Sequence, residues 1–242
     1  MSLLRLERVG KRYTRGRHEY VALHDVSLTV EPGEHVAIWG VPRSGRTTLL
    51  RIAAGLERPD EGSVHFGGRT FEPGAHGREG IGFVHLAAVA GAGPSVVDDV
   101  AMPLLARGVP RNKARARAAA ALERVDAGHC AGDVSAELET SELVRAAIAQ
   151  ALVADPRLLV IDDPTSHVGL LERESLLLLL RSIAGGGIAV LMTTGEAIGV
   201  SGVDRALTIS EGRLGAEVVA EPSQVIPLNR ARIRAMGIAS DG

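Results

Sequence analysis

Aromatic residues and cysteine are the scarcest features of this sequence. Phenylalanine, tyrosine and tryptophan together make up 2% of the 242 residues, and Cys130 is the single cysteine. A lone cysteine excludes an internal disulfide and fits a reducing compartment. Because alanine, leucine, valine and glycine are abundant while aromatic residues are few, the composition favours an α/β fold over a β-sandwich.

Long hydrophobic runs and a strong net charge are also missing. The longest apolar run, Leu176–Leu180, is far shorter than a membrane span, and the N-terminus has no hydrophobic region of a signal peptide. The formal net charge of −2 provides no overall basic field for nucleic acid or anionic lipid. We therefore expect a soluble chain that does not bind nucleic acid and that reaches a membrane only through a partner.

Short apolar runs, separated by polar and glycine-containing segments, predict the strands. Several such runs are typical of strands buried in a parallel sheet. They are Val36–Trp39, Ile81–Val84, Leu158–Ile161, Ile188–Met192 and Ala206–Ile209. Alternating apolar and polar residues near 4–6 and 26–30 predict half-buried strands at the N-terminal side.

Between residues 94 and 154 the pattern changes to helix. Arg111–Val125 is rich in alanine and other strong helix formers, and Thr140 or Ser141 is a suitable cap for a helix that runs to Leu152. We predict a single domain over residues 1–242, with a helical subdomain inserted at about 87–154 and a tail without clear pattern at about 222–242.

The segment from Gly40 to Thr48, GVPRSGRTT, has the pattern of a phosphate-binding loop. It matches G-x-x-x-x-G-K-[ST] except that position 46 is arginine. Glycines let the backbone turn its N–H groups toward one anion, and the start of the following helix adds its positive dipole end. An ordinary turn between strand and helix is the alternative. The predicted phosphate-binding residues are Gly40, Val41, Pro42, Arg43, Ser44, Gly45, Arg46, Thr47 and Thr48.

Two acidic residues, Asp162 and Asp163, follow the apolar run Leu158–Ile161, at the sheet edge where open α/β folds bind ligands. A solvated strand end would explain them in isolation. In a chain with a phosphate loop they predict a Mg²⁺ site, because phosphoryl chemistry places the ion between a loop hydroxyl and an acid on a neighbouring strand. Thr47 and Asp162 are the predicted metal ligands, and Asp163 is the predicted catalytic residue that orients or deprotonates water.

Several motifs together resemble the nucleotide-binding subunit of ABC transporters, from Leu3 to about Leu214. ALHDVSLTVEPGEHVAIWG, VRAAIAQALVADPRLLVIDDPTS and VDRALTISEGRL occur in the family's order. SVVDDVAMPLLARGV resembles the start of the helical subdomain in cassettes of the lipoprotein-release and macrolide-efflux type. VGKRYTRG resembles the segment whose aromatic residue stacks on adenine, which makes Tyr13 the expected adenine contact.

The resemblance implies a fold, ligands and partners. The expected fold class is α/β, a P-loop NTPase core with an N-terminal antiparallel β part and an inserted helical subdomain. The expected ligands are ATP and Mg²⁺. Family members form head-to-tail dimers and drive a membrane permease, so a transmembrane permease and a second nucleotide-binding subunit are the expected partners. The expected location is cytoplasmic and peripheral, at the inner face of the cell membrane.

The chain departs from the family pattern in six places that serve hydrolysis, counting the three-residue signature segment as one. Arg46 replaces a lysine, and its planar fork places its donors differently. Asp163 replaces a glutamate and is one methylene shorter; a misplacement of about 1 Å can cost roughly 100-fold in rate. The other changes are Leu86 for a glutamine, Gly169 for an aspartate, Gly195 for the switch histidine, and Glu139, Thr140 and Ser141 for the signature serine and two glycines.

The signature segment has two possible alignments. The gapless alignment from Arg145 places Glu139 at the serine position, where its carboxylate would repel the partner's γ-phosphate unless the side chain turns to solvent. A second alignment places Ser135 at that position but needs a four-residue insertion. We rank the gapless alignment first.

These departures predict a cassette that binds MgATP and hydrolyses it poorly. Because a homodimer would contain two weak sites, we expect a heterodimer with a more active cassette. The alternative is a non-hydrolysing regulatory or structural subunit of a membrane complex. No zinc site is expected, because His65, His76 and His85 lack ligand spacing and the pair at 129–130 has no second pair.

Overall fold

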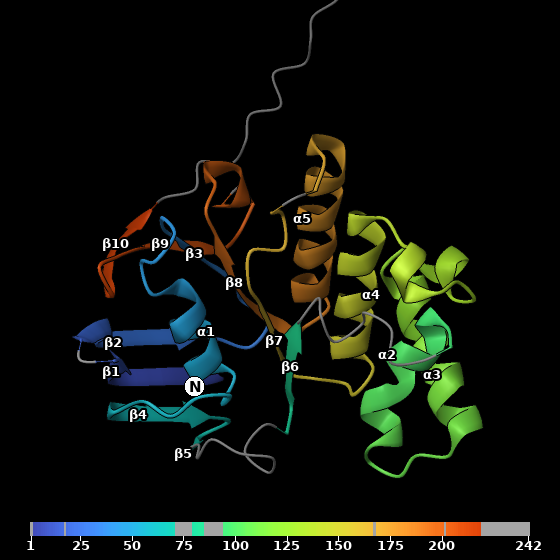
Figure 1. The fold of residues 1–242 in the computed structure, drawn as a ribbon, viewed down its shortest axis with the longest axis horizontal. Coiled ribbons are helices and arrows are strands. Elements are labelled where there is room, and N and C mark those ends of the chain that lie inside the picture. The colour runs from blue at the N-terminus through green and yellow to red at the C-terminus, as the bar shows by residue number, and fades with distance from the viewer. Residues whose placement is uncertain are drawn as a thin grey trace, which may run out of the picture.

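A six-stranded sheet forms the centre of the molecule (Figure 1). The strand order is β10-β9-β3-β8-β7-β6, with β10 antiparallel to β9 and the other neighbours parallel. The strands are β3 (His35–Trp39), β6 (Ile81–Val84), β7 (Leu158–Ile161), β8 (Ala189–Thr194), β9 (Arg205–Ser210) and β10 (Arg213–Val218). The computed structural model describes residues 2–16, 18–70, 79–84, 94–166, 168–200 and 202–218.

A second, antiparallel sheet of order β2-β1-β4-β5 lies on one side of the central sheet (Figure 1). Its strands are β1 (Leu4–Arg15), β2 (His18–Val30), β4 (Glu61–Phe66) and β5 (Arg69–Thr70). Helix α1 (Arg46–Ala53) packs between the two sheets, because its buried side chains share one hydrophobic cluster with both of them.

Helices cover the opposite side of the central sheet. Between β6 and β7 the chain forms α2 (Val96–Leu105), α3 (Arg111–Arg124) and α4 (Thr140–Leu152), with 3₁₀ turns η2 (Gly128–Cys130) and η3 (Ser135–Glu137) before α4. Helix α5 (Leu170–Gly185) lies beside α4 (Figure 1), and turn η4 (Ala197–Val200) follows β8.

The central sheet separates two hydrophobic cores. Its strands alternate, so that Leu159 and Ile161 of β7 join the helical core while Leu158 and Val160 join the core around α1. All four residues of β7 are buried. This burial on both faces explains why the sequence shows an uninterrupted apolar run there.

The structure confirms the predicted fold class, and three helices occur between β6 and β7. The main difference is the hairpin of β1 and β2, which extends through polar residues well beyond the predicted segments. Backbone pairing with three register shifts holds this hairpin, so hydrophobic alternation is lost along it. Leu86, His76, His85 and the predicted tail at 222–242 lie outside the described residues.

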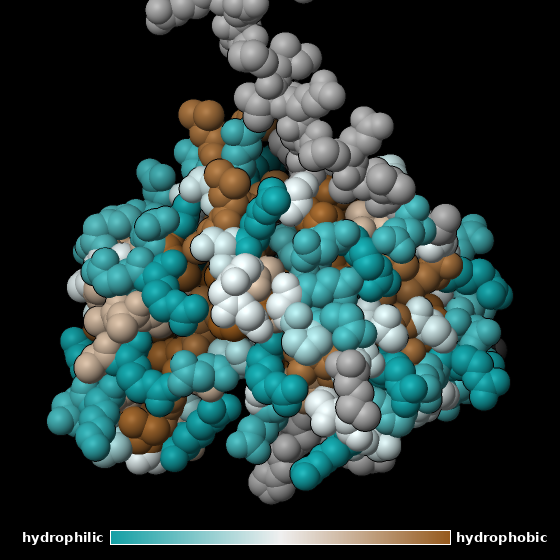
Figure 2. Space-filling model, turned by 180° about the vertical axis from the view of Figure 1, so that it is seen from behind, coloured by the Kyte–Doolittle hydropathy of each residue, from teal (hydrophilic) through white to brown (hydrophobic). Residues whose placement is uncertain are grey.

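Within the described part of the chain, no helix combines the length and the hydrophobicity that crossing a membrane requires. The rear face of the molecule, shown in Figure 2, carries mostly hydrophilic residues, with hydrophobic ones scattered between them.

Candidate functional site

The predicted phosphate loop lies between β3 and α1, and its two glycines are required by close backbone contacts. A Cβ at Gly40 would lie 2.5 Å from the carbonyl oxygen of Ile209, and one at Gly45 would lie 2.5 Å from that of Ala22. Gly45 also has a φ of 106°, which disfavours any other residue. The backbone N–H of Gly40 donates to the carbonyl of Thr194 at 3.1 Å, which attaches the loop to the end of β8.

The turn between β9 and β10 supports the loop from behind. The N–H of Gly212 donates to the carbonyl of Ser44 at 2.9 Å, and the carbonyl of Gly212 accepts from the N–H of His24 at 2.8 Å. A Cβ at Gly212 would lie 2.5 Å from the carbonyl oxygen of Ala22. The loop is therefore clamped between β2 and the end of the central sheet.

The loop has features that fit an anion. The hydroxyl of Ser44 is buried and has no hydrogen-bond partner among the described residues, although a buried polar atom normally has one. The loop leads directly into α1, whose first N–H groups are free of intrahelical partners. An unpaired hydroxyl beside a helix start is consistent with a phosphate group as ligand.

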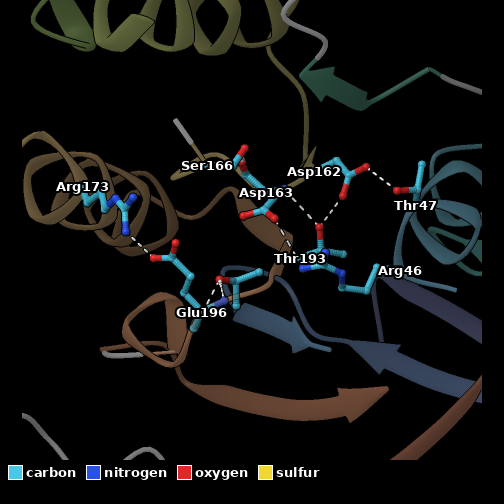
Figure 3. A network of polar contacts seen from close by, with 9 residues as sticks. Arg46, Thr47, Asp162, Asp163, Ser166, Arg173, Thr193 and Glu196 are labelled. Carbon is cyan, nitrogen blue, oxygen red and sulfur yellow. Dashed lines mark hydrogen bonds and ion pairs between the residues drawn. The ribbon is translucent and has the colours of Figure 1, made fainter. Parts of the chain in front are cut away.

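The predicted metal ligands lie in contact. The hydroxyl of Thr47 donates to one carboxylate oxygen of Asp162 at 2.7 Å, and the hydroxyl of Thr193 donates to the other (Figure 3). A hydroxyl and a carboxylate are the hard oxygen ligands that Mg²⁺ prefers. Among the described residues there is no group of three or more His, Cys, Asp or Glu side chains that could hold a metal. The residues therefore fit an ion that takes its remaining ligands from phosphate and water.

Asp163, the predicted catalytic residue, is paired with Arg46 from the phosphate loop. A guanidinium nitrogen of Arg46 lies 3.4 Å from the Asp163 carboxylate, and both side chains are largely covered, with exposed fractions of 13% and 25%. Burial raises the pKa of Asp163, the Arg46 charge lowers it, and the neighbouring Asp162 raises it again. The backbone of Asp163 is left-handed, with a φ of 44°, a strained conformation for a non-glycine residue.

Because Gly195 has no side chain, there is space beside it for the Arg46 guanidinium. A Cβ at this position would lie 3.2 Å from one terminal nitrogen of Arg46 and 3.6 Å from the Asp163 carboxylate. From the sequence alone, the changes at positions 46 and 195 were interpreted as separate losses. In the structure the two residues are neighbours, and the guanidinium fills space beside the glycine.

Three polar residues around this site, Thr193, Glu196 and Arg173, were not predicted from the sequence. Thr193 bonds both Asp162 and the backbone N–H of Asp163, the latter at 3.1 Å, and Glu196 forms an ion pair with Arg173 (Figure 3). The signal for Thr193 was present, because it follows the apolar run predicted as a strand and lies at the same sheet edge as Asp162.

Tyr13 lies beside the end of the phosphate loop. Its hydroxyl is 3.5 Å from the Thr48 hydroxyl, and its ring stacks on Tyr20 with centroids 5.4 Å apart. Burial, followed by a hydrogen bond with Glu57, raises the pKa of Tyr13 to about 12. Its role as an adenine contact stays a prediction.

The structure distinguishes the two residues considered for the signature position. Glu139 is the exposed N-cap residue of α4 and forms a reciprocal capping box with Glu142, whose carboxylate accepts from the Glu139 N–H at 2.9 Å. Ser135 is buried, and its hydroxyl donates to Asp99. Glu139 therefore lies at the start of α4, whereas the Ser135 hydroxyl points into the helical core, and the assignment of the signature position stays a prediction. Gly169 is the N-cap residue of α5.

A parallel sheet with a glycine loop, a threonine hydroxyl and an aspartate meeting at its carboxyl edge defines a P-loop NTPase fold. The chain belongs to the ABC transporter family, whose model matches residues 23–166. It is 34% identical over 229 residues to the lipoprotein-releasing system ATP-binding protein LolD of Shewanella sp. strain MR-4, covering 92% of this chain and 98% of that protein.

Other relatives and solved structures agree with this family. The macrolide export ATP-binding/permease protein MacB 1/2 of Paracoccus denitrificans is 31% identical, and the match covers 89% of this chain and 33% of that protein. A dimeric ATP-binding cassette solved in a post-hydrolysis state with ADP and phosphate superposes with a TM-score of 0.80 at 25% identity, covering 89% of this chain and 97% of that one.

Proposed function

We propose that this chain is the ATP-binding subunit of an ABC transporter, that it binds MgATP at the Gly40–Thr48 loop, and that it hydrolyses ATP poorly. The observation that carries the proposal is the combination at one sheet edge of a glycine loop and a Thr47–Asp162 contact with an arginine paired to Asp163. The first two features serve binding, and the third pairs the predicted catalytic carboxylate with the arginine that replaces the family's lysine.

For binding, each part of the site has a task. The backbone N–H groups of the loop and the Ser44 hydroxyl would hold phosphate oxygens, and Arg46 supplies the positive charge. Thr47 and Asp162 would hold Mg²⁺, which neutralises phosphate charge when bound. Tyr13, at the end of the loop, remains the proposed adenine contact.

For hydrolysis, the site is poorly arranged. Asp163 is one methylene shorter than the glutamate of the family pattern, and a misplacement of about 1 Å can cost roughly 100-fold in rate. Gly195 offers no side chain to a terminal phosphate. At the start of α4, the exposed Glu139 places a carboxylate where the resemblance implies contact with a partner's phosphate, so like charges would meet.

The relatives support a membrane permease and a second cassette as partners. MacB is named as an ATP-binding and permease protein, and this chain matches a third of it, which is consistent with a permease as the partner of this cassette. A heterodimer with a more active cassette remains our proposal. The permease would hold this heterodimer at the inner face of the cell membrane. The damaged signature at Glu139 would then also face the partner's ATP.

A nucleotide titration of the purified chain tests the binding proposal. We expect Arg46→Ala to weaken MgATP binding roughly 10-fold to 100-fold, because it removes a charge-assisted contact with phosphate. The matched control is Arg111→Ala, since the exposed Arg111 of α3 pairs with Asp98 of α2, away from the loop, and should leave affinity unchanged. Equal affinities for Arg46→Ala and the unmodified chain would contradict the loop assignment.

The second candidate is a regulatory or structural subunit without turnover, which the Arg46–Asp163 ion pair also fits. ATPase assays of the chain alone and with its co-purified membrane partners separate the two functions. If the partners give no stimulation and Asp162→Ala leaves transport unchanged, the chain is structural. If Asp162→Ala lowers transport, nucleotide binding by this chain matters for the complex.

A further inference from the structure

Arg46 is an incompletely paired cation inside the site. Its side chain is only 13% exposed, and its contact with Asp163 is 3.4 Å long, whereas charge-assisted contacts of this kind are usually about 2.8 Å. A guanidinium carries five N–H donors. In the part of the chain that the structure describes, Asp163 is the one carboxylate that pairs with it. The guanidinium therefore has donors left for a second anion.

The carboxylate of Asp163 has its positively charged partner in the same contact with Arg46. The other acidic side chains near it have their own partners, since Asp162 accepts from Thr47 and Thr193, and Glu196 pairs with Arg173 (Figure 3). Of the described cationic side chains, only Arg46 contacts Asp163. Without Arg46, this carboxylate would lie between two other acids with no counter-charge.

The position of Arg46 lets its guanidinium contact either Asp163 or a ligand phosphate, but not both fully. The guanidinium extends from the phosphate loop, where a nucleotide's phosphates would lie, toward the end of β7. Gly195 provides space beside this reach, because a Cβ there would lie 3.2 Å from a terminal nitrogen of Arg46 and 3.6 Å, an ordinary contact distance, from the Asp163 carboxylate. One guanidinium therefore stands between a carboxylate of the protein and the phosphates of a ligand.

We propose that Asp163 and the terminal phosphate of a bound nucleoside triphosphate compete for Arg46. In the free chain, Asp163 holds the guanidinium and lowers affinity for the triphosphate. A bound triphosphate takes over the guanidinium through its terminal phosphate, whereas a nucleoside diphosphate leaves the ion pair in place. This inference rests on the proposed binding of nucleotide at the Gly40–Thr48 loop and adds an internal competitor to it.

A double-mutant cycle tests the competition. Affinities for a non-hydrolysable ATP analogue and for ADP, both with Mg²⁺, are measured for the unmodified chain, Asp163→Asn, Arg46→Gln and the double variant. We expect Asp163→Asn to bind the triphosphate roughly threefold to tenfold more tightly, the range of a part-buried ion pair, with little change for ADP. In the Arg46→Gln background the same substitution should have no effect.

The cycle separates competition from simple repulsion. If Asp163 only repelled phosphate, Asp163→Asn would raise affinity equally in both backgrounds, and the inference would be overturned. Glu196→Gln is the matched control, because it removes a nearby charge that does not contact Arg46, and it should leave the triphosphate-to-diphosphate affinity ratio unchanged. If Arg46→Gln does not bind nucleotide at millimolar concentration, Arg46→Lys replaces it, and Asp163→Asn should then give a smaller gain than in the unmodified chain.

The outcomes also separate this inference from the proposed function. Failure of the unmodified, folded chain to bind either nucleotide would overturn the proposed function. Nucleotide binding that is unchanged or weakened by Asp163→Asn would overturn only the competition.

Discussion

His35 is a buried titratable residue in β3, away from the phosphate loop. It is 2% exposed, and its Nε2 atom lies 3.3 Å from the sulfur of Met192. Within the part of the chain that the structure describes, its Nδ1 atom has no hydrogen-bond partner. Burial, with a smaller effect of Arg181, lowers the pKa of His35 to about 4, although the opposing charge of Asp204 raises it. The folded chain therefore contains a neutral imidazole.

This environment predicts a loss of stability in acid. The pKa of His35 is lower in the folded chain, about 4, than its ordinary value of 6.5, so its contribution is complete above pH 6.5 and is lost as the pH falls toward 4. The free energy of unfolding should fall by about 3 kcal/mol across this range from His35 alone. Urea unfolding at several pH values should show that the free energy of unfolding of His35→Leu depends less steeply on pH than that of the unmodified chain.

The exposed His18 provides the matched control for this prediction. His18→Leu should retain the slope of the unmodified chain between pH 6.5 and 4. An equally steep slope in His35→Leu would show that other groups cause the acid sensitivity.

At the residue scale, the sequence predicted contacts between residues that were assigned to the same ligand, such as the two predicted Mg²⁺ ligands. Thr47 and Asp162 were expected to lie together, and their side chains are hydrogen-bonded. The Arg46–Asp163 pair was not predicted, because it depends on how far a longer side chain reaches once β3, β8 and β7 are adjacent. The space beside Gly195 that permits it is also a property of the assembled sheet edge.

Helix α4 begins with residues that differ from the signature serine and glycines of the ABC family pattern. Its N-cap residue is Glu139, and the capping box with Glu142 satisfies N–H groups that a helix otherwise leaves unpaired. The acidic residue therefore has a structural use at this helix start, independent of any partner.

This cap predicts a cost for removing the carboxylate. Glu139→Ala should lower the free energy of unfolding by about 1 kcal/mol, the usual loss for a capping side chain, as measured by urea unfolding. Glu139→Ser should retain most of the stability, because serine is a good N-cap residue. Glu137→Ala, also exposed and just outside α4, is the control, and a similar loss there would argue against the cap.

At the element scale, the sequence located short apolar strands of the central sheet. The runs at β6 and β7 were predicted with the bounds that the structure shows. The polar arms of β1 and β2 were not predicted, since their pairing comes from backbone hydrogen bonds and from bulges at which Arg8 and Asp25 take positive φ values. Such bulges have no reliable hydrophobic signature.

The whole molecule has two cores that share one sheet. Strands β7 and β8 each contribute alternate residues to both cores, so neither core is complete without the strands of the other. We infer that the described part of the chain unfolds as one unit.

This arrangement predicts that a destabilising substitution in the helical core lowers the stability of the whole described domain. Leu104→Ala in α2 should cost about 2–5 kcal/mol, because Leu104 is fully buried in the helical core. Fluorescence of Trp39, the single tryptophan, and far-UV circular dichroism should report the same lowered urea midpoint. Met102→Ala on the exposed side of α2 is the control, and a Trp39 transition that stays unchanged in Leu104→Ala would indicate separate units.

The turn between β9 and β10 determines how far the chain can be shortened. Its Gly212 joins the backbone of Ser44 to that of His24, so a residue near the end of the described chain supports a loop that begins at Gly40. A truncation after Ser210 would keep every predicted ligand of the nucleotide and still remove this support. Trimmed versions for crystallisation or fusion should therefore keep β10.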